Sequence, residues 1–438
     1  MKAIKNRFLL LIAALGLISC EGFLDEKPEK SILVPQTVED VRALLDYYTN
    51  LNDNALADFI MADDWVTEDA NWESLSPWEQ NAYLWKQQVF EPSERSTDYT
   101  KLYRKIFTVN VSLEVLEGLG TGTEVRNLRG EALFIRALAY FQLAQLFLPS
   151  PMLGGEEIKL PVKLNPNVNE PSQWWPVSKV VMQVEQDLVE AFELVGSSSQ
   201  FKNRPNKQVV KAVLARLYLY EERWEDALNA ANYVLEQGTV SLLDYHEKDS
   251  TEAYPFSLFN SEVMYYGITS SFSVTASSAT YINPDLMGKY EQGDLRRSLF
   301  FTESGEKFLF KGSYNGDYNL FTGISLPEMY LSGAEALVRM DRVQEGLDLM
   351  AILAEKRYQS MDFWEGNLSK NPLDLVLEER QKELVFRGTR WMDMKRLHAL
   401  GELDDVPTRE IADQNYQLTG SDKLYLILPS YELDLENN

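Results

Sequence analysis

Residues 209–237 read VVKAVLARLYLYEERWEDALNAANYVLEQ, and their apolar pattern predicts two consecutive helices. In the first half, apolar side chains recur every three or four positions, at Val210, Val213, Leu214 and Leu217. A few polar residues separate this run from a second one at Trp224, Ala227, Leu228 and Ala231. Because the connection is short, we expect two antiparallel helices joined by a tight turn.

This helical hairpin carries small residues where two helices must approach closely, and it resembles a tetratricopeptide unit. A weaker copy of the pattern follows at Ala334, Leu337, Gly346, Met350 and Leu353. Such helix pairs stack because each one buries its apolar face against the next. Two longer helices are expected upstream, over 99–119 and 126–148, where Pro149 and Pro151 end the second one.

Two regions lack a sustained helical period. Residues 57–92 are rich in Trp, Asp and Asn, and residues 238–327 are rich in Ser, Gly, Tyr and Phe. The second region is too long for a structureless loop, so short strands are expected around 263–267 and 307–310. The sequence therefore predicts a mainly α fold, a tetratricopeptide-type helical-repeat scaffold with irregular insertions and few short strands. Binding surfaces tend to lie in such insertions.

Composition restricts the classes of function. The chain has 438 residues with 67 acidic and 42 basic side chains, which gives a formal net charge of -25. Phosphate backbones would repel such a chain, so nucleic acid is not an expected partner. One Cys excludes an internal disulfide, and His246 and His398 are too few for a His-based metal cage. We expect no cofactor and no metal site.

The first residues indicate export. They combine a basic start, an apolar run too short to span a bilayer, and small residues before Cys20. Leu17-Ile18-Ser19-Cys20 resembles a bacterial lipobox, in which the Cys is acylated; the alternative is a plain signal cleaved nearby, with Cys20 incidental. We expect a signal peptide over 1–19, a lipidated tether over 20–30 and a single α-helical domain over 31–438.

Several stretches resemble, in order, the SusD/RagB family of outer-membrane nutrient-binding lipoproteins of Bacteroidetes. The C-terminal series is the most specific. The matching segments are the lipobox at Cys20, Phe23-Leu24-Asp25, Gly130-Glu131-Ala132 with Arg136-Ala137 and Tyr140-Phe141, Leu214 to Leu219, Glu379 to Leu384 with Phe386, Gly388, Arg390-Trp391, Asp393 and Arg396, and the tail from Leu424 to Pro429 and Glu432. The chain departs from the family pattern at Arg387 and Ile427, and it is short for the family.

The resemblance implies a lipid-anchored protein at the cell surface of the outer membrane. It also implies a role without catalysis, in which the protein binds a nutrient glycan and delivers it to a SusC-like TonB-dependent transporter. Three alternatives remain open: a peptide-binding RagB-like receptor, an all-α glycosidase that uses two carboxylates, and a solenoid adaptor that binds only protein. The C-terminal charges Arg380, Glu383, Arg390 and Asp393 are expected to form an internal ion-pair lattice rather than a catalytic site.

Candidate ligand residues come from the two irregular regions. Aromatic rings stack on the apolar C–H face of a sugar, while nearby carboxylates and amides bind its hydroxyl groups. The residues selected on this basis are Asp64, Trp65, Asn71, Trp72, Tyr281, Tyr290, Tyr314 and Tyr318. A calcium site at Asp63 and Asp64, or at Asn315 and Asp317, lacks EF-hand spacing and is not predicted.

Overall fold

The computed structural model describes residues 34–269, 279–403 and 406–436. The predicted signal peptide, the acylation site at Cys20 and most of the tether therefore lie outside the described residues. From Thr37 onward the chain forms one compact unit. Among the helices described, none combines the length and the apolar character needed to cross a membrane.

The predicted hairpin is confirmed. Helix α10 spans Lys207–Tyr220 and helix α11 spans Trp224–Gln237. The Asn206 side chain accepts a hydrogen bond from the backbone N–H of Val209, which caps the start of α10. Gly238 ends α11 in the left-handed conformation, with φ of 63°. Ala227 and Ala231 are fully buried, so small side chains lie at the close approach of the helices.

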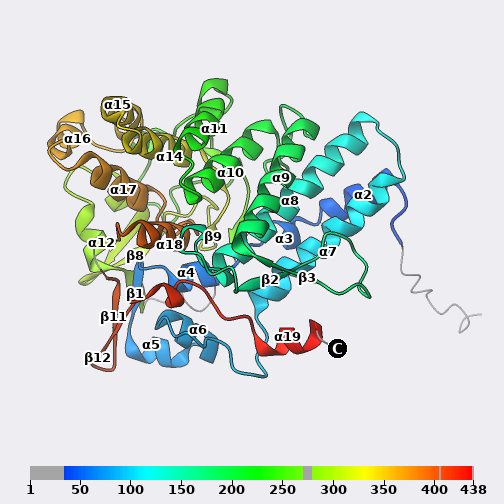
Figure 1. Ribbon diagram of the computed structural model, residues 1–438. Coiled ribbons are helices and arrows are strands. Elements are labelled where there is room, and N and C mark those ends of the chain that lie inside the picture. Colours follow the sequence, from blue (N-terminus) through cyan, green and yellow to red (C-terminus); the bar gives the residue numbers. More distant parts are fainter. Residues whose placement is uncertain (1–33, 270–278, 404–405, 437–438) are drawn as a thin grey trace, which may run out of the picture. The chain divides into compact units, whose positions relative to one another are not determined.

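The weaker copy also forms a helix pair, made of α14 (Leu326–Arg339) and α15 (Val343–Ala354). Upstream, the predicted long helices are α7 (Thr97–Glu117) and α8 (Thr123–Phe147), and α9 covers Val177–Leu194. Successive helices from α7 to α11, then α14 and α15, pack against one another in chain order (Figure 1). The fold is thus the mainly α, tetratricopeptide-type scaffold that the sequence predicted.

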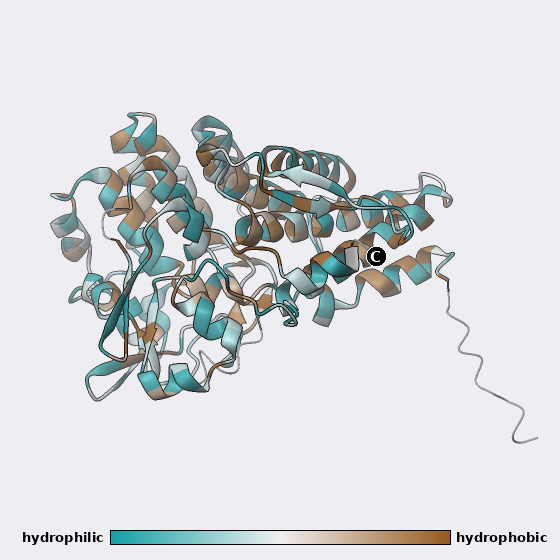
Figure 2. Ribbon diagram, turned by 60° about the horizontal axis from the view of Figure 1, so that its bottom comes forward, coloured by the Kyte–Doolittle hydropathy of each residue, from teal (hydrophilic) through white to brown (hydrophobic). Residues whose placement is uncertain are grey.

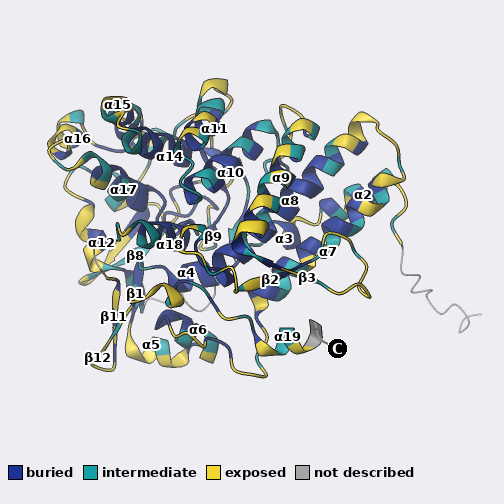
Figure 3. Cartoon of the chain, viewed as in Figure 1, coloured by how far each residue is buried: buried dark blue, intermediate teal, exposed yellow. Residues whose placement is uncertain are grey.

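Burial explains why this scaffold is stable. The helices carry hydrophilic and hydrophobic residues along the same element (Figure 2). Most of α8, α10 and α14 is buried, whereas α15 and α16 expose much of their surface (Figure 3). The central helices are therefore covered by neighbours, and their apolar side chains provide the main hydrophobic stabilisation of the fold.

Shorter helices complete the scaffold. They are α2 (Val38–Leu45), α3 (Tyr48–Leu51), α4 (Ala57–Met61), α5 (Asp69–Ser74), α6 (Pro77–Tyr83), α12 (Pro284–Lys289), α13 (Arg296–Phe300), α16 (Met361–Asn367), α17 (Pro372–Glu383), α18 (Arg390–Leu400) and α19 (Ser430–Glu436). The described part of the chain also contains the 3-10 turns η1 (Pro151–Leu153), η2 (Tyr245–Glu247) and η3 (Ser421–Lys423).

The described strands form antiparallel pairs rather than a large sheet. The pairs are β1 (Trp65–Thr67) with β6 (Thr280–Ile282), β2 (Lys159–Val162) with β3 (Gln173–Pro176), β4 (Val263–Tyr265) with β10 (Ile324–Ser325), β5 (Ile268–Thr269) with β9 (Leu320–Phe321), β7 (Phe301–Ser304) with β8 (Lys307–Phe310), and β11 (Thr408–Ile411) with β12 (Gln414–Gln417). The strands expected around 263–267 and 307–310 are confirmed as β4 and β8. Pairing of β1 with β6 joins the two irregular regions.

The ion-pair lattice predicted for the C-terminal series is also confirmed. Arg380 donates from Nε to Asp393 at 2.9 Å, and Arg396 donates from Nε to the other oxygen of Asp393 at 2.8 Å. Glu383 accepts hydrogen bonds from the buried Arg357 side chain. These buried charges pair with one another, so they hold α17 and α18 in place.

Candidate functional site

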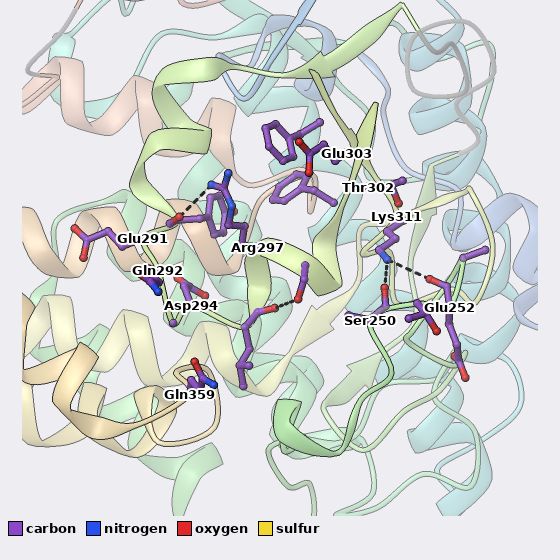
Figure 4. A pocket seen from close by; sticks show the side chains of 18 residues that line it. Ser250, Glu252, Glu291, Gln292, Asp294, Arg297, Thr302, Glu303, Lys311 and Gln359 are labelled. Atoms are coloured by element: carbon purple, nitrogen blue, oxygen red, sulfur yellow. Dashed lines mark hydrogen bonds between the residues drawn. The ribbon is translucent and has the colours of Figure 1, made fainter. Parts of the chain in front are cut away.

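A cavity of about 1020 Å³ lies beside the β7–β8 hairpin, and we call it the main cavity (Figure 4). Its walls come from several separate segments, namely residues 250–253, 290–295, 297–298, 301–303, 308, 311 and 359. This volume is at the upper end of the range for small-molecule sites. A ligand larger than one sugar ring can therefore be accommodated.

Local sequence explains the shape of two walls. The β7–β8 hairpin turns at Gly305, where φ is 64° and the register pairs Ser304 with Lys307. Between α12 and α13 the chain turns at Gly293, where φ is 88°. A Cβ at Gly293 would lie 2.5 Å from ring atoms of Phe363, so only glycine fits this turn.

Arg297 provides a cation on the wall of the main cavity. Its Nη1 donates to the carbonyl oxygens of Met287 and Tyr290 at 3.4 and 3.3 Å. The guanidinium carbon lies 4.8 Å from the ring centroid of Phe308. Within the described ranges, no carboxylate lies within 4.0 Å of this guanidinium. The guanidinium therefore lies over one face of the half-buried Phe308 ring, which places a cation and an aromatic ring side by side on this wall.

Lys311 holds the opposite wall. Its Nζ donates to the backbone carbonyl oxygens of Ser250 at 2.6 Å and Glu252 at 3.2 Å, as the dashed lines in Figure 4 show. Partial burial removes water from the ammonium group and lowers the pKa of Lys311. This lysine therefore connects the 250–252 loop to the end of the β7–β8 hairpin.

Acidic side chains also line the main cavity, but they differ in their surroundings. Asp294 is buried and accepts hydrogen bonds from Arg296 Nε at 2.8 Å and Nη2 at 2.7 Å. Glu252 and Glu303 are exposed. Asp294 therefore belongs to the internal ion-pair lattice. The exposed Glu252 and Glu303 give the rim of the main cavity a negative charge, which disfavours anionic ligands.

A smaller cavity of about 190 Å³ adjoins the main cavity, and both include Arg297 and Phe308 in their walls. Tyr281 lines this smaller cavity, and the ammonium nitrogen of Lys307 lies 4.8 Å from its ring centroid. Lys307 also forms an ion pair with Glu68. Tyr281 is therefore a predicted site residue that lines a cavity and keeps part of its side chain exposed.

Three predicted aromatic residues are buried, which corrects the expectation that they stack on a ligand. Trp65 is 1% exposed, and its Nε1 donates to the carbonyl oxygen of Phe59 at 2.6 Å. Tyr314 is fully buried beneath the guanidinium of Arg387, which lies 3.4 Å from its ring centroid. Tyr290 lines the main cavity but is 1% exposed. The rings of these three residues instead form part of the hydrophobic core beneath the irregular segments.

Tyr290 and the predicted polar residues have structural partners. The Tyr290 hydroxyl donates to the carbonyl oxygen of Lys382 at 2.8 Å. Asn71 donates to the hydroxyls of Thr67 at 2.6 Å and Thr280 at 3.2 Å, so it supports the β1–β6 pair. Asp64 is 3% exposed, and burial together with the adjacent Asp63 raises its pKa to about 7. A buried acid of this kind cannot contact a ligand at the surface.

Two further predicted aromatics lie outside both cavities. Trp72 is half-buried, and its Nε1 donates to the carbonyl oxygen of Gln80 at 3.3 Å. Tyr318 is 48% exposed but lines neither cavity. The structure therefore brings only Tyr281 and Tyr290 to the edge of the cavities, and it leaves the other predicted residues elsewhere.

Sequence reasoning missed Arg297, Phe308, Lys311 and Gln359 as wall residues of the main cavity. Phe308 lies on the strand that was predicted at 307–310. The alternation of side chains along a strand does not reveal which of its two faces borders a cavity. Gln359 follows α15, outside both irregular regions. No spacing in the sequence links it to the hairpin, because the contact arises only from folding.

Comparisons with known proteins agree with this architecture. A family model described as "Starch-binding associating with outer membrane" matches residues 22–219. A SusD-like protein of Formosa agariphila is 23% identical over 309 residues, which cover 67% of this chain and 54% of the relative. The chain thus spans about half the length of that curated relative.

Solved structures share the fold. A SusD superfamily protein from Bacteroides thetaiotaomicron superposes with a TM-score of 0.73 at 18% identity, covering 92% of this chain and 98% of that one. A structure described as a laminarin-binding SusD-like protein gives a TM-score of 0.63 at 20% identity, covering 90% and 95%. The family model over residues 22–219, the curated relative and the helical fold thus agree that the chain is similar to SusD-like proteins and shares their fold.

Proposed function

We propose that this protein binds a neutral oligosaccharide in the main cavity and presents it to a SusC-like TonB-dependent outer-membrane transporter. The observation that carries the proposal is the main cavity itself, with its volume of about 1020 Å³ and its Arg297–Phe308 wall. A sugar ring offers apolar C–H faces for Phe308 and hydroxyl groups for the polar side chains around it.

The polar side chains of the main cavity suit neutral hydroxyl groups. Gln292, Ser298 and Gln359 line it and are exposed, so each presents donors and acceptors to solvent. The acidic rim at Glu252 and Glu303 favours a neutral glycan over a polyanionic one. The laminarin-binding relative makes neutral β-glucan fragments a sensible first probe.

Anchoring and delivery form the second part of the proposal. An acylated Cys20 would hold the domain at the outer membrane, where a transporter partner reaches a high effective concentration. The family description of association with the outer membrane supports this location. Co-purification from detergent-solubilised membranes tests the partnership, and recovery of the protein free of any transporter would contradict it.

Binding without cleavage is the third part. Asp294 is engaged by Arg296 and Lys382, so it has no free oxygen to serve as a general acid or base. Incubation of the purified protein with laminari-oligosaccharides should leave their length unchanged by chromatography. Shortening that disappears on replacement of Glu252 or Glu303 would establish the glycosidase alternative instead.

Calorimetric titration tests the binding site. Phe308→Ala should weaken binding several-fold, since one stacking platform contributes on the order of 1 kcal/mol. Phe107→Ala is the matched control, because Phe107 is 48% exposed on α7 and lines neither cavity. Equal affinity of both variants and the wild type would remove the main cavity from the proposal. Response to peptides alone would change the ligand class to that of a RagB-like receptor.

A further inference from the structure

A separate cavity of about 260 Å³ lies where the loop before α10, the loop after α11 and strand β4 meet. Its walls share no residue with the main cavity or with the smaller cavity at Tyr281. Hydroxyl-bearing residues Ser197, Ser198, Ser199, Thr239, Ser241 and Ser261 line it together with the apolar residues Phe201, Val209, Val240, Val263 and Met264. We call it the serine pocket. Hydroxyl groups both donate and accept hydrogen bonds, so this lining suits an oxygen-rich ligand.

Lys202 supplies a positive charge to the serine pocket. Its Nζ donates to the carbonyl oxygen of Asn260 at 2.7 Å, which uses one of its three donors. Over the described ranges, no carboxylate lies within 4.0 Å of this nitrogen, although the chain carries a net charge of -25. Burial without a counterion lowers the pKa of Lys202. A ligand that brings a negative charge would stabilise this ammonium group.

Gln208 supplies an amide group to the same pocket. The side chain is 6% exposed, and one end of its amide is bonded to the hydroxyl of Thr239. The other end forms no hydrogen bond with any residue that the structure describes. The free end of the amide is open to solvent, so it can donate a hydrogen bond to an acceptor on a ligand.

We infer that the serine pocket binds a small carboxylate bearing several hydroxyl groups, with the chemistry of a single sugar acid. The carboxylate accepts from Lys202 and Gln208, and the hydroxyl groups bond to the surrounding serines. The volume of about 260 Å³ is below the usual range for drug-sized ligands, which limits the occupant to about one ring. This site is independent of the neutral oligosaccharide proposed for the main cavity.

Saturation-transfer NMR and calorimetry with D-glucuronate and D-glucose test the inference on the mature protein. The wild type should bind glucuronate in a saturable manner and more tightly than glucose. Ser261→Asp should weaken glucuronate binding by about tenfold, because the new carboxylate pairs with Lys202 and repels the ligand. Ser261 is exposed, so this substitution leaves the core intact.

Ser257→Asp is the matched control, since Ser257 is exposed nearby but does not line the serine pocket. It should keep wild-type affinity for glucuronate. Lys202→Met should abolish the preference for glucuronate over glucose. Equal binding of the two sugars by the wild type, absence of saturable glucuronate binding, or equal effects of Ser261→Asp and Ser257→Asp would each overturn the inference. Laminari-oligosaccharide binding, measured on the same samples, reports separately on the main cavity.

Discussion

Arg390 donates two hydrogen bonds to the carboxylate of Asp63, at 2.6 and 2.7 Å, across 327 positions of sequence. This bidentate pair links helix α18 to the first part of the irregular region 57–92, just before β1. Its geometry is the strong form of an arginine–carboxylate interaction. The pair therefore fixes the irregular region relative to the C-terminal lattice.

Arg390→Ala should destabilise the protein by roughly 3 kcal/mol, since it leaves Asp63 without its cation beside the buried Asp64. Urea denaturation measures the free energy of unfolding. Arg342→Ala is the control, because Arg342 and Glu345 form an exposed pair at 2.6 Å and its loss should change stability by less than about 1 kcal/mol. Equal losses in the two variants would contradict the importance of the Asp63 contact.

Asp64 should make stability depend on pH. Its folded-state pKa of about 7 lies above the ordinary value of 3.8, so the folded state binds the proton more tightly than the unfolded state. The contribution of Asp64 to stability is therefore full below pH 3.8 and is lost as pH rises to about 7. The slope across that window should be roughly 1 kcal/mol per pH unit.

Asp64→Asn should flatten this slope, which chemical denaturation at several pH values measures. Asp285→Asn serves as the control, because Asp285 is exposed at the start of α12. The explanation fails if both variants keep the wild-type slope.

Trp65→Ala should reduce stability rather than glycan affinity. Trp65 is 1% exposed and packs on Tyr83, with ring centroids 4.9 Å apart. Its removal creates a cavity and should lower the free energy of unfolding by roughly 3–5 kcal/mol. Thermal unfolding should show a large decrease in Tm. Trp174→Ala, at a position that is 40% exposed, should leave Tm nearly unchanged.

Leu217→Asp should prevent stable folding, because Leu217 is fully buried on α10 and the new carboxylate would have no partner. The expected loss is above about 4 kcal/mol. Val189→Asp is the matched control on α9, where Val189 is 48% exposed. Circular dichroism should show native helicity for Val189→Asp and reduced helicity for Leu217→Asp. Native thermal stability of Leu217→Asp would show that this face is not part of the core.

Cys20→Ala should release the protein from membranes or leave its signal uncleaved, since acylation of this thiol is the expected anchor. Fractionation of cells and mass spectrometry of the N-terminus measure the result. An unacylated N-terminus beyond residue 20 in the native protein would establish the plain secretory signal instead.

The sequence by itself determined the helical scaffold, because helix formation depends on local periodicity. The apolar spacing at Val210 to Leu217 and at Trp224 to Ala231 predicted α10 and α11, and the C-terminal charges predicted the buried lattice. Such patterns can be recognised in a sequence because residues three or four positions apart share one helix face.

Tertiary structure alone decided which side chains border a cavity. Trp65 and Tyr314 look like sugar platforms in an irregular sequence, yet folding buries both. Arg297 and Gln359 are brought together at one cavity although 62 positions separate them, the difference between 359 and 297. The burial of a residue in a non-periodic segment depends on contacts between distant parts of the chain, and no local spacing encodes those contacts.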